Sequence, residues 1–359
     1  MKRVLPLLII FSLFVSCTNP FMEEILGRGK KKPLSGESEE FGPFDLQAEV
    51  DLYSDAVDDM TIAVPRNLIL ATNITIPKNS SGAALTITST SGGPYTLTRG
   101  AVEWESRGVL FSVPAGAELI FENIIVDGNC LNADGTIKLD GNISAAIVQI
   151  ESGGIFTMKN GAVLKNNVSS NGGAVLVRGT FTMNGGTING NIASNDGTGG
   201  KGGGVFINNG GTFNMSGGTI SGNTSLENGG GGVYLQDGAF TMSGGQITGN
   251  TTNVGYGPGG GVYVEGGIFM MDGGTVSGNT AADGNGGGVY VAGGTFRISN
   301  GIIYGSDADA ALRNTAVGGS GAALYVNGNS CTAEYGKGNT WYSISTNSNT
   351  VFVGDGVYG

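Results

Sequence analysis

Short apolar segments alternate with glycine pairs along most of the chain, and from about residue 147 this pattern recurs at regular intervals. Each unit spans about 28 residues and holds three strand-like segments, of the kinds GVYV, TFTM and TISGN. None of them has the length or the 3.6-residue period of a helix. A pair such as Gly244–Gly245 separates the second segment from the third, and glycine accepts the positive φ that a tight corner needs.

These repeats predict a solenoid. Three short strands joined by glycine corners make one coil, and stacked coils pair each strand in parallel with its counterpart in the next coil. We therefore expect an all-β protein, a single-stranded right-handed parallel β-helix (solenoid) of about ten coils over residues 62–330, the right hand following from the usual sense of parallel crossovers. Residues 331–359 would form its C-terminal cap.

The segment before the solenoid has a different period. Apolar residues recur at helical spacing over residues 45–61, behind Asp45 as a candidate N-cap. We predict one short capping helix that covers the first coil. Its apolar face would consist of Leu46, Val50, Tyr53, Val57 and Met60.

Side-chain alternation within the strands predicts the core. Phe240 and Met242 share one face of their strand and Thr241 takes the other, so the apolar pair is expected inside. In the GVYV segment at 261–264 both faces are apolar; we favour the two valines inward and Tyr263 outward, and the reverse stays open. The aligned phenylalanines of the expected interior are Phe156, Phe181, Phe213, Phe240, Phe269 and Phe296.

An asparagine follows the third segment in consecutive units. Amide side chains stacked at the strand spacing can hydrogen-bond from coil to coil. We expect a structural ladder at a corner of the solenoid rather than a ligand site. Its members are Asn167, Asn191, Asn223, Asn250 and Asn279.

Aromatic residues occupy equivalent positions of the first segment. Facing outward, they would form an aromatic stripe with about 4.8 Å between coils. Tyrosine suits binding because its ring is apolar and its hydroxyl polar, and sugars stack on such rings; equally, aromatic residues favour strands and stabilise one another across them. The turns beside them vary in length, as on the recognition edge of a solenoid. The possible ligand-binding stripe is Phe206, Tyr234, Tyr263, Tyr290 and Tyr325.

The N-terminus has the form of an export signal. Two basic residues precede an apolar run at 4–15 that is too short to span a bilayer comfortably. The next residues, through Cys17, resemble a bacterial lipobox with Phe14 in place of the usual leucine. We expect a signal peptide at 1–16, lipidation of Cys17 and a flexible lipidated tether at 17–44, with a plain secretory signal as the alternative. The protein would then be anchored by lipid in the bacterial cell envelope, at the outer membrane, facing the surface or the periplasm.

Charge and cysteine content narrow the possible partners. The net charge is −11 and histidine is absent, so nothing here attracts nucleic acid. Cys130 and Cys331 would lie about seven coils apart, too far for a disulfide. The membrane, through the N-terminal lipid, and a glycan or protein ligand remain as expected partners.

The repeats resemble the right-handed parallel β-helix of the pectin-lyase-like superfamily over roughly residues 62–330. More narrowly, they are similar to the repeats of bacterial polymorphic outer-membrane and adhesin-like proteins, which pair a GGA-[ILV] phrase with F-x-x-N. The sequence at 172–175 fits the first phrase, and 220–223 and 276–279 fit the second with an aliphatic residue in place of phenylalanine. The resemblance implies the fold, and it implies little about function.

The resemblance also extends to enzymes with this fold, polysaccharide lyases and hydrolases, which use clustered acidic residues. Here the only Asp-Asp pair, Asp58–Asp59, lies in the predicted cap, and the acids of the regular units fall at different positions of the repeat. The best remaining cluster of acidic residues lies in an irregular insertion before the regular coils. The simpler interpretation of this insertion is a solvated loop without a catalytic role. Two loops, 195–197 and 283–285, only faintly resemble calcium loops. We therefore expect no catalytic site, no metal and no cofactor. The insertion's cluster is Asp127, Asp134 and Asp140 with Lys138.

Three functions are consistent with these sequence features. The first is a non-catalytic, adhesin-like protein that binds a glycan or a host or envelope protein along the solenoid face. The second is a polysaccharide lyase or hydrolase on the same fold, and the third is a structural spacer of the envelope. The absent histidine and the dispersed acids favour the first and third functions over the second.

Overall fold

The structure is a computed structural model that describes residues 44–100, 108–134, 136–137, 145–194, 200–253, 257–328, 331–337 and 340–344, and the strands at 352–353 and 356–357. Residues 45–359 form one compact unit, separate from residues 1–44. The predicted signal peptide, the lipidation site Cys17 and the tether at 17–44 therefore fall almost entirely outside the described residues. Within the described part, no helix is long and apolar enough to cross a membrane.

The unit begins with the predicted helix, which ends earlier than the apolar pattern over residues 45–61 predicts. Helix α2 spans Leu46–Asp51 and continues as the 3-10 turn η1, Leu52–Asp55. Asp45 is the N-cap, accepting from the backbone N–H groups of Gln47 and Ala48, and Leu46, Val50 and Tyr53 are buried. The prediction was wrong at Val57, which is 79% exposed, and at Met60, which begins the first strand. Both residues follow the end of the helix, so helical spacing no longer sets their direction.

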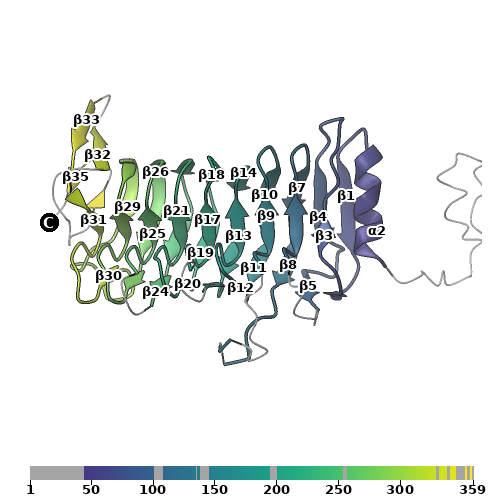
Figure 1. The fold of residues 1–359 in the computed structure, drawn as a ribbon, viewed down its shortest axis with the longest axis horizontal. Coiled ribbons are helices and arrows are strands. Elements are labelled where there is room, and N and C mark those ends of the chain that lie inside the picture. Colours follow the sequence, from purple (N-terminus) through teal and green to yellow (C-terminus); the bar gives the residue numbers. More distant parts are fainter. Residues whose placement is uncertain are drawn as a thin grey trace, which may run out of the picture. The chain divides into compact units, whose positions relative to one another are not determined.

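Nearly all remaining regular structure lies in three sheets (Figure 1). The twenty-stranded sheet comprises β1 (Met60–Val64), β2 (Leu68–Leu70), β4 (Leu85–Ser89), β5 (Tyr95–Arg99), β7 (Glu118–Phe121), β8 (Ile124–Asp127), β10 (Ile155–Met158), β11 (Val163–Lys165), β14 (Thr180–Met183), β15 (Thr187–Asn189), β18 (Thr212–Met215), β19 (Thr219–Ser221), β22 (Ala239–Met242), β23 (Gln246–Thr248), β26 (Ile268–Ser277), β29 (Gly294–Ile303), β32 (Cys331–Lys337), β33 (Thr340–Ser343), β34 (Phe352–Val353) and β35 (Gly356–Val357).

The other two sheets each take one strand from successive coils. The nine-stranded sheet comprises β3 (Ile74–Thr75), β6 (Phe111–Val113), β9 (Val148–Ile150), β13 (Val175–Val177), β17 (Val205–Ile207), β21 (Val233–Leu235), β25 (Val262–Val264), β28 (Val289–Val291) and β31 (Leu324–Val326). The six-stranded sheet comprises β12 (Val168–Ser169), β16 (Ile192–Ala193), β20 (Thr224–Ser225), β24 (Thr251–Thr252), β27 (Thr280–Ala281) and β30 (Thr315–Ala316).

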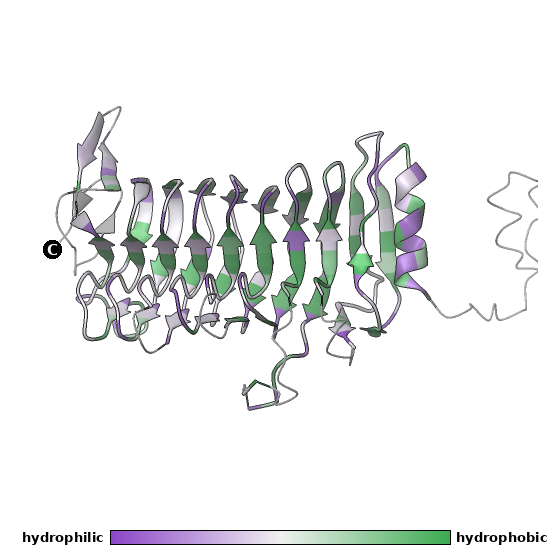
Figure 2. Cartoon of the chain, viewed as in Figure 1, coloured by the Kyte–Doolittle hydropathy of each residue, from purple (hydrophilic) through white to green (hydrophobic). Residues whose placement is uncertain are grey.

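Stacking of like strands in parallel confirms the predicted β-helix. In the twenty-stranded sheet Phe213 pairs with Phe240, and Phe240 with Phe269, in unbroken register. Buried apolar residues recur in the strands from coil to coil and form a common interior; Figure 2 shows many of these strands as hydrophobic. The interior phenylalanine stack is fully buried, and its successive ring centroids lie 4.6–5.3 Å apart. Its members are Phe156, Phe181, Phe213, Phe240, Phe269 and Phe296.

The glycine corners are required by both conformation and space. Gly245 has a φ of +82°, which disfavours any residue with a Cβ. A Cβ there would lie 2.6 Å from Met215 Cε and 2.8 Å from the Gly218 carbonyl oxygen of the preceding coil. The corner therefore packs so closely on its neighbour that glycine recurs at each coil.

The two ends of the solenoid are closed differently. Helix α2 packs against β1 and β3 at the first coil. At the other end β32 extends the twenty-stranded sheet in parallel from β29, and β33 then pairs with it as an antiparallel hairpin. This hairpin projects beyond the outline of the coils (Figure 1).

Candidate functional site

The aromatic stripe lies on the nine-stranded sheet, one residue per strand from β17 to β31. Successive members pair directly in the parallel register, as with Tyr263 and Tyr290. The flanking residues Val262 and Val264 are fully buried, whereas Tyr263 keeps part of its surface. The favoured orientation, with valines inward and tyrosine outward, is therefore confirmed.

The stripe is less open to solvent than outward orientation alone implies. Phe206, Tyr234 and Tyr290 keep only 4%, 3% and 8% of their surface. From Tyr234 to Tyr325 the ring centroids are 4.5–5.2 Å apart and the planes deviate by 3–18°. Each inner ring therefore has both faces covered by its neighbours. The stripe presents ring edges and hydroxyl groups, so the expectation that sugars stack on its ring faces has to be corrected.

A charged clamp closes the N-terminal end of the stripe. Lys201 Nζ lies 5.0 Å from the centre of the Tyr234 ring and 3.2 Å from Glu265 Oε2. The same carboxylate oxygen accepts a hydrogen bond of 2.9 Å from the Tyr234 hydroxyl. Here the ring of Phe206 meets Tyr234 edge-on, with planes 66° apart. The clamp thus ties three coils together and separates Phe206 from the stacked tyrosines.

Burial and these neighbours change the acidity of the tyrosines. Burial raises the pKa of Tyr263 to about 12, and the nearby Tyr290 and Glu265 add to the rise. The pKa of Tyr234 is raised further, again chiefly by burial and then by Tyr263 and Glu265. Burial also raises the pKa of Tyr290. These hydroxyls stay neutral at physiological pH and can both donate and accept hydrogen bonds.

The turns of unequal length lie directly against the stripe. A Cβ at Gly229 would lie 3.1 Å from Tyr263 Cδ2, and one at Gly286 would lie 2.7 Å from Tyr290 Cβ. In the described residues, the turns that contain Gly229 and Gly286 therefore border tyrosines of the stripe. The tyrosine edges of the stripe and the described residues of these adjoining turns are the candidate recognition site.

The asparagine ladder forms the corner between the twenty-stranded and six-stranded sheets. Asn223 donates from both its backbone N and Nδ2 to Asn250 Oδ1, at 3.0 Å each, and its Nδ2 also donates to the Ile188 carbonyl oxygen. The same pattern joins Asn191 to Asn223. All five predicted members are fully buried. Their polar atoms are engaged within the chain, which supports the structural interpretation: Asn167, Asn191, Asn223, Asn250 and Asn279.

Both ends of the ladder use residues that the sequence analysis missed. Asn279 donates to Asn314 Oδ1 at 2.8 Å, so Asn314 is a further step. The sequence does contain a signal for Asn314, because the Asn-Thr pair at 314–315 also occurs in earlier coils. An insertion at 305–313 breaks the spacing and obscures this match. At the other end the buried guanidinium of Arg99 lies 3.4 Å from Asn167 Oδ1, where it faces the oxygen end of the amide row.

The clamp residue Lys201 was also missed as a site residue. It is the only lysine or arginine between residues 179 and 296, so its isolation was the available signal. Its position over an aromatic ring could not be read from the repeat, because it lies in a turn whose length is not conserved from coil to coil.

The acids of the insertion are not brought together in the described part. Asp127 pairs with Lys165 at 3.5 Å and accepts from Asn166. Asp134 is engaged by the backbone N and hydroxyl of Thr136, and these hydrogen bonds lower its pKa. Asp140 and Lys138 lie outside the described residues. Within the described residues, no group of three or more acidic or cysteine side chains could hold a metal ion.

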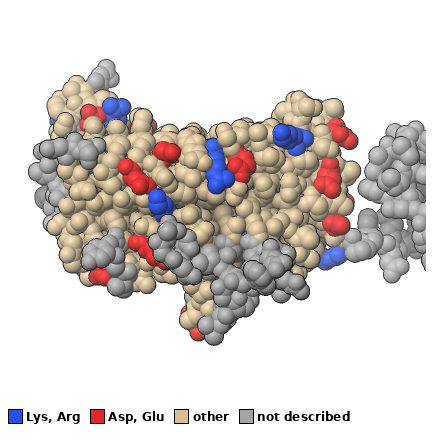
Figure 3. Space-filling model, viewed as in Figure 1, with Lys and Arg blue, Asp and Glu red and all other residues tan. Residues whose placement is uncertain are grey.

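The free cysteines and the surface charge complete the chemical inventory. Cys130 and Cys331 are free thiols, in line with the distance expected between them. On the face in view, charged residues form isolated spots of both signs on a largely uncharged surface (Figure 3). That face offers no extended field of one sign, and a partner bound there would be recognised through hydroxyl, amide and aromatic groups.

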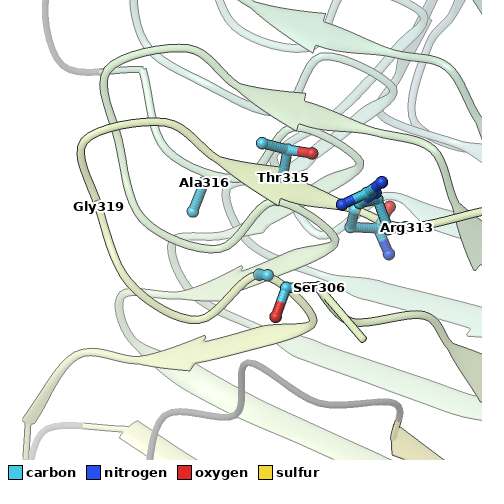
Figure 4. Close-up of a pocket in the computed structure, with 7 residues that line it drawn as sticks. Ser306, Arg313, Thr315, Ala316 and Gly319 are labelled. Carbon is cyan, nitrogen blue, oxygen red and sulfur yellow. The ribbon is translucent and has the colours of Figure 1, made fainter. Parts of the chain in front are cut away.

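A hollow of 390 Å³ lies at the end of the six-stranded sheet (Figure 4). It is separate from the stripe and has one charged group, Arg313, so it lacks a pair of titratable groups for acid–base chemistry. Its lining residues are Ser306, Arg313, Asn314, Thr315, Ala316, Gly319 and Ala322.

The chain was also compared with known proteins. No protein-family model, no curated protein and no solved structure matches it.

Proposed function

We propose that this chain is a lipid-anchored, non-catalytic protein of the bacterial cell envelope that binds a glycan along its solenoid. The observation that carries the proposal is the continuous row of tyrosine hydroxyl edges, bordered by turns of unequal length on an otherwise constant scaffold. The anchor rests on the export-type N-terminus and Cys17. The adhesin-like repeats are compatible with this role.

The edge of the stripe suits hydroxyl-rich ligands. Tyr263, Tyr290 and Tyr325 carry phenol groups in register on consecutive coils, and a phenol hydroxyl can donate to or accept from a sugar hydroxyl. The Tyr263 hydroxyl also interacts with that of Tyr234. An extended chain lying along the solenoid axis would meet several of these phenol groups at once. Individually weak contacts then add, because one rigid support holds them all.

A polysaccharide lyase or hydrolase is the second candidate. A glycosidase pair requires carboxylates about 5–10 Å apart. In the regular coils the described acids are engaged separately: Asp237 accepts from the Gly210 N–H, and Asp272 from the Ser299 hydroxyl. These contacts favour the binding function over catalysis.

The test removes the hydroxyls and keeps the rings. The triple variant Tyr263→Phe, Tyr290→Phe, Tyr325→Phe preserves the stacking, so its thermal unfolding midpoint should match that of the wild type. On a glycan array, the full chain in detergent should bind at least one glycan, and the triple variant should lose that signal. Tyr95→Phe, on the twenty-stranded sheet, is the matched control.

Other results of these binding measurements would favour a different site or a different function. An unchanged array signal in the triple variant would contradict the proposed site. A wild-type chain that binds no glycan would favour a protein ligand or a spacer role. Release of reducing or unsaturated sugar ends from a bound polysaccharide would favour the enzyme.

A further inference from the structure

A second surface of the solenoid carries an exposed aromatic residue, Trp341. It lies on the outer side of the twenty-stranded sheet, at the C-terminal end. Arg297 of β29 points outward, because its neighbours Phe296 and Ile298 are buried. Glu334 of β32 pairs with Arg297 in register, so both residues lie on the outer face.

The hairpin places Trp341 on the same face. Gly336 follows Glu334 by two residues and therefore shares its side of β32. Trp341 of β33 lies directly opposite Gly336 in the antiparallel register. The outer face thus carries Arg297, Glu334 and Trp341 on three adjacent strands.

The indole ring rests on the backbone of Gly336. A Cβ built at Gly336 would lie 3.2, 3.3 and 3.4 Å from Cζ3, Cη2 and Cε3 of Trp341. Three adjacent ring atoms at nearly equal distance mean that this position lies over the ring face, not beyond its edge. Glycine therefore gives the ring a flat seat, and one face of the indole is covered.

The Trp341 residue nevertheless remains 40% exposed. Contacts with Gly336 and with the Arg297 guanidinium therefore leave a large part of this residue open to solvent. The stripe differs, because its inner rings have both faces covered. Among these two aromatic surfaces, Trp341 is the one with the geometry for stacking against the face of a sugar ring.

A pair of hydrogen-bonding groups contacts the ring, with the Arg297 guanidinium lying over it. The Arg297 guanidinium carbon lies 5.5 Å from the ring centre, and Arg297 Nε donates to Glu334 Oε2 at 2.7 Å. This contact fixes the fork of the guanidinium, whose other N–H groups and the carboxylate can bind neighbouring hydroxyls. Because the two charges neutralise each other, the site does not favour an ionic ligand.

Beyond β26, whose Asp272 accepts from the Ser299 hydroxyl, the outer wall of the sheet is uncharged. Six strands of the twenty-stranded sheet, β14, β15, β18, β19, β22 and β23, contain no charged residue. Their outward positions carry mainly hydroxyl and amide groups, as in the row of Thr182, Asn214 and Thr241. A neutral chain that meets Trp341 could continue along this wall without burying an unpaired charge.

We propose that Trp341 is a stacking platform for one pyranose ring of an uncharged polysaccharide, with Arg297 and Glu334 binding its hydroxyl groups. The inference rests on the glycan ligand of the proposed function and places a contact on a different sheet from the aromatic stripe. The occupant follows from the exposed indole, the neutralised ion pair and the uncharged wall beyond β26.

Affinity electrophoresis of the full chain in detergent tests this site, with gels containing hydroxyethyl cellulose, xylan, laminarin or mannan as probes. At least one probe should retard the wild type, and added salt should not change the effect, because no net charge is involved. Trp341→Ala should weaken binding by about tenfold, the loss of one stacking contact. Tyr342→Ala is the matched control: Tyr342 is 43% exposed and stacks on Tyr335, on the other face of the hairpin, so binding should stay unchanged.

A second readout keeps the test independent of folding. Trp104 and Trp341 are the only tryptophans, so in the variant Trp104→Phe the emission reports Trp341 alone and should shift when the retarding probe is added. Gly336→Val should abolish that shift by displacing the ring while Trp341 is retained. If the wild type is retarded but Trp341→Ala behaves identically, only the Trp341 platform is overturned. If no polysaccharide retards the wild type, this inference and the proposed glycan binding both fail.

Discussion

The solenoid carries two aromatic columns with almost the same geometry and very different surroundings. In the interior phenylalanine stack, ring centroids are 4.6–5.3 Å apart and every ring is fully buried. In the tyrosine part of the aromatic stripe they are 4.5–5.2 Å apart, but the ring edges and hydroxyls face outward. The common spacing follows from the distance between paired strands.

This comparison separates what the fold imposes from what is left for recognition. Aromatic residues repeated at one position of successive coils are brought into ring contact, and most of them stack, whether or not a ligand exists. Stacking alone is therefore no evidence for binding. What distinguishes the stripe is the hydroxyl edge, the clamp of Lys201 and Glu265, and the adjoining turns.

The largest expected effect comes from breaking the interior column. Phe240→Ala leaves a cavity between Phe213 and Phe269, and we expect a loss of about 3–5 kcal/mol in the free energy of unfolding. Chemical denaturation measures the loss. Thr241→Ala, on the outer face of the same strand, is the control and should change stability by less than about 0.5 kcal/mol. Equal losses in both variants would contradict the assignment of the two faces.

A smaller effect is expected from breaking the outer column. Tyr263→Ala removes two stacking contacts at about 1 kcal/mol each, and half-buried surroundings let solvent fill the gap. We expect a loss of about 2 kcal/mol by the same measurement, clearly below that of Phe240→Ala. Tyr263→Phe keeps the stack and should be nearly neutral. A loss in Tyr263→Ala as large as in Phe240→Ala would mean that the stripe is part of the core.

Much of this comparison could be predicted from the sequence. The repeat fixes the register, because equivalent residues of successive coils must pair, and strand alternation then fixes the inner and outer faces. The asparagine ladder followed from the same alignment. These features depend on local periodicity, which the chain displays directly.

The rest depends on segments that do not repeat. The coverage of Tyr234 comes from Lys201, which reaches over it from a variable turn. Trp341 packs on Gly336 because an antiparallel hairpin outside the regular coils pairs the two residues. The early end of the capping helix, which leaves Val57 exposed, reflects the entry into β1 at Met60. In each case tertiary contacts, not periodicity, set the position.

The smallest expected effect distinguishes the columns by pH. The pKa of Tyr263 is about 12 in the folded chain, against an ordinary value of 10.0, chiefly because of burial. Between these values the unfolded chain loses this proton and the folded chain keeps it, so the unfolded state binds fewer protons and stability falls as pH rises. The stabilising contribution is complete below about pH 10 and is lost toward about pH 12.

The interior column has no titratable group and cannot contribute to this loss, so the variant Tyr263→Phe isolates the hydroxyl. Its thermal midpoint should equal that of the wild type at about pH 8 and fall less than the wild type at about pH 11. Differential scanning calorimetry at both pH values measures the difference. Lysines and the tyrosines outside the aromatic stripe titrate in both proteins and cancel in the comparison. If the midpoints of the two proteins instead change equally with pH, the Tyr263 hydroxyl has the same pKa in the folded and unfolded chains. The tyrosine column would then not differ from the phenylalanine column in its contribution to the pH dependence of stability.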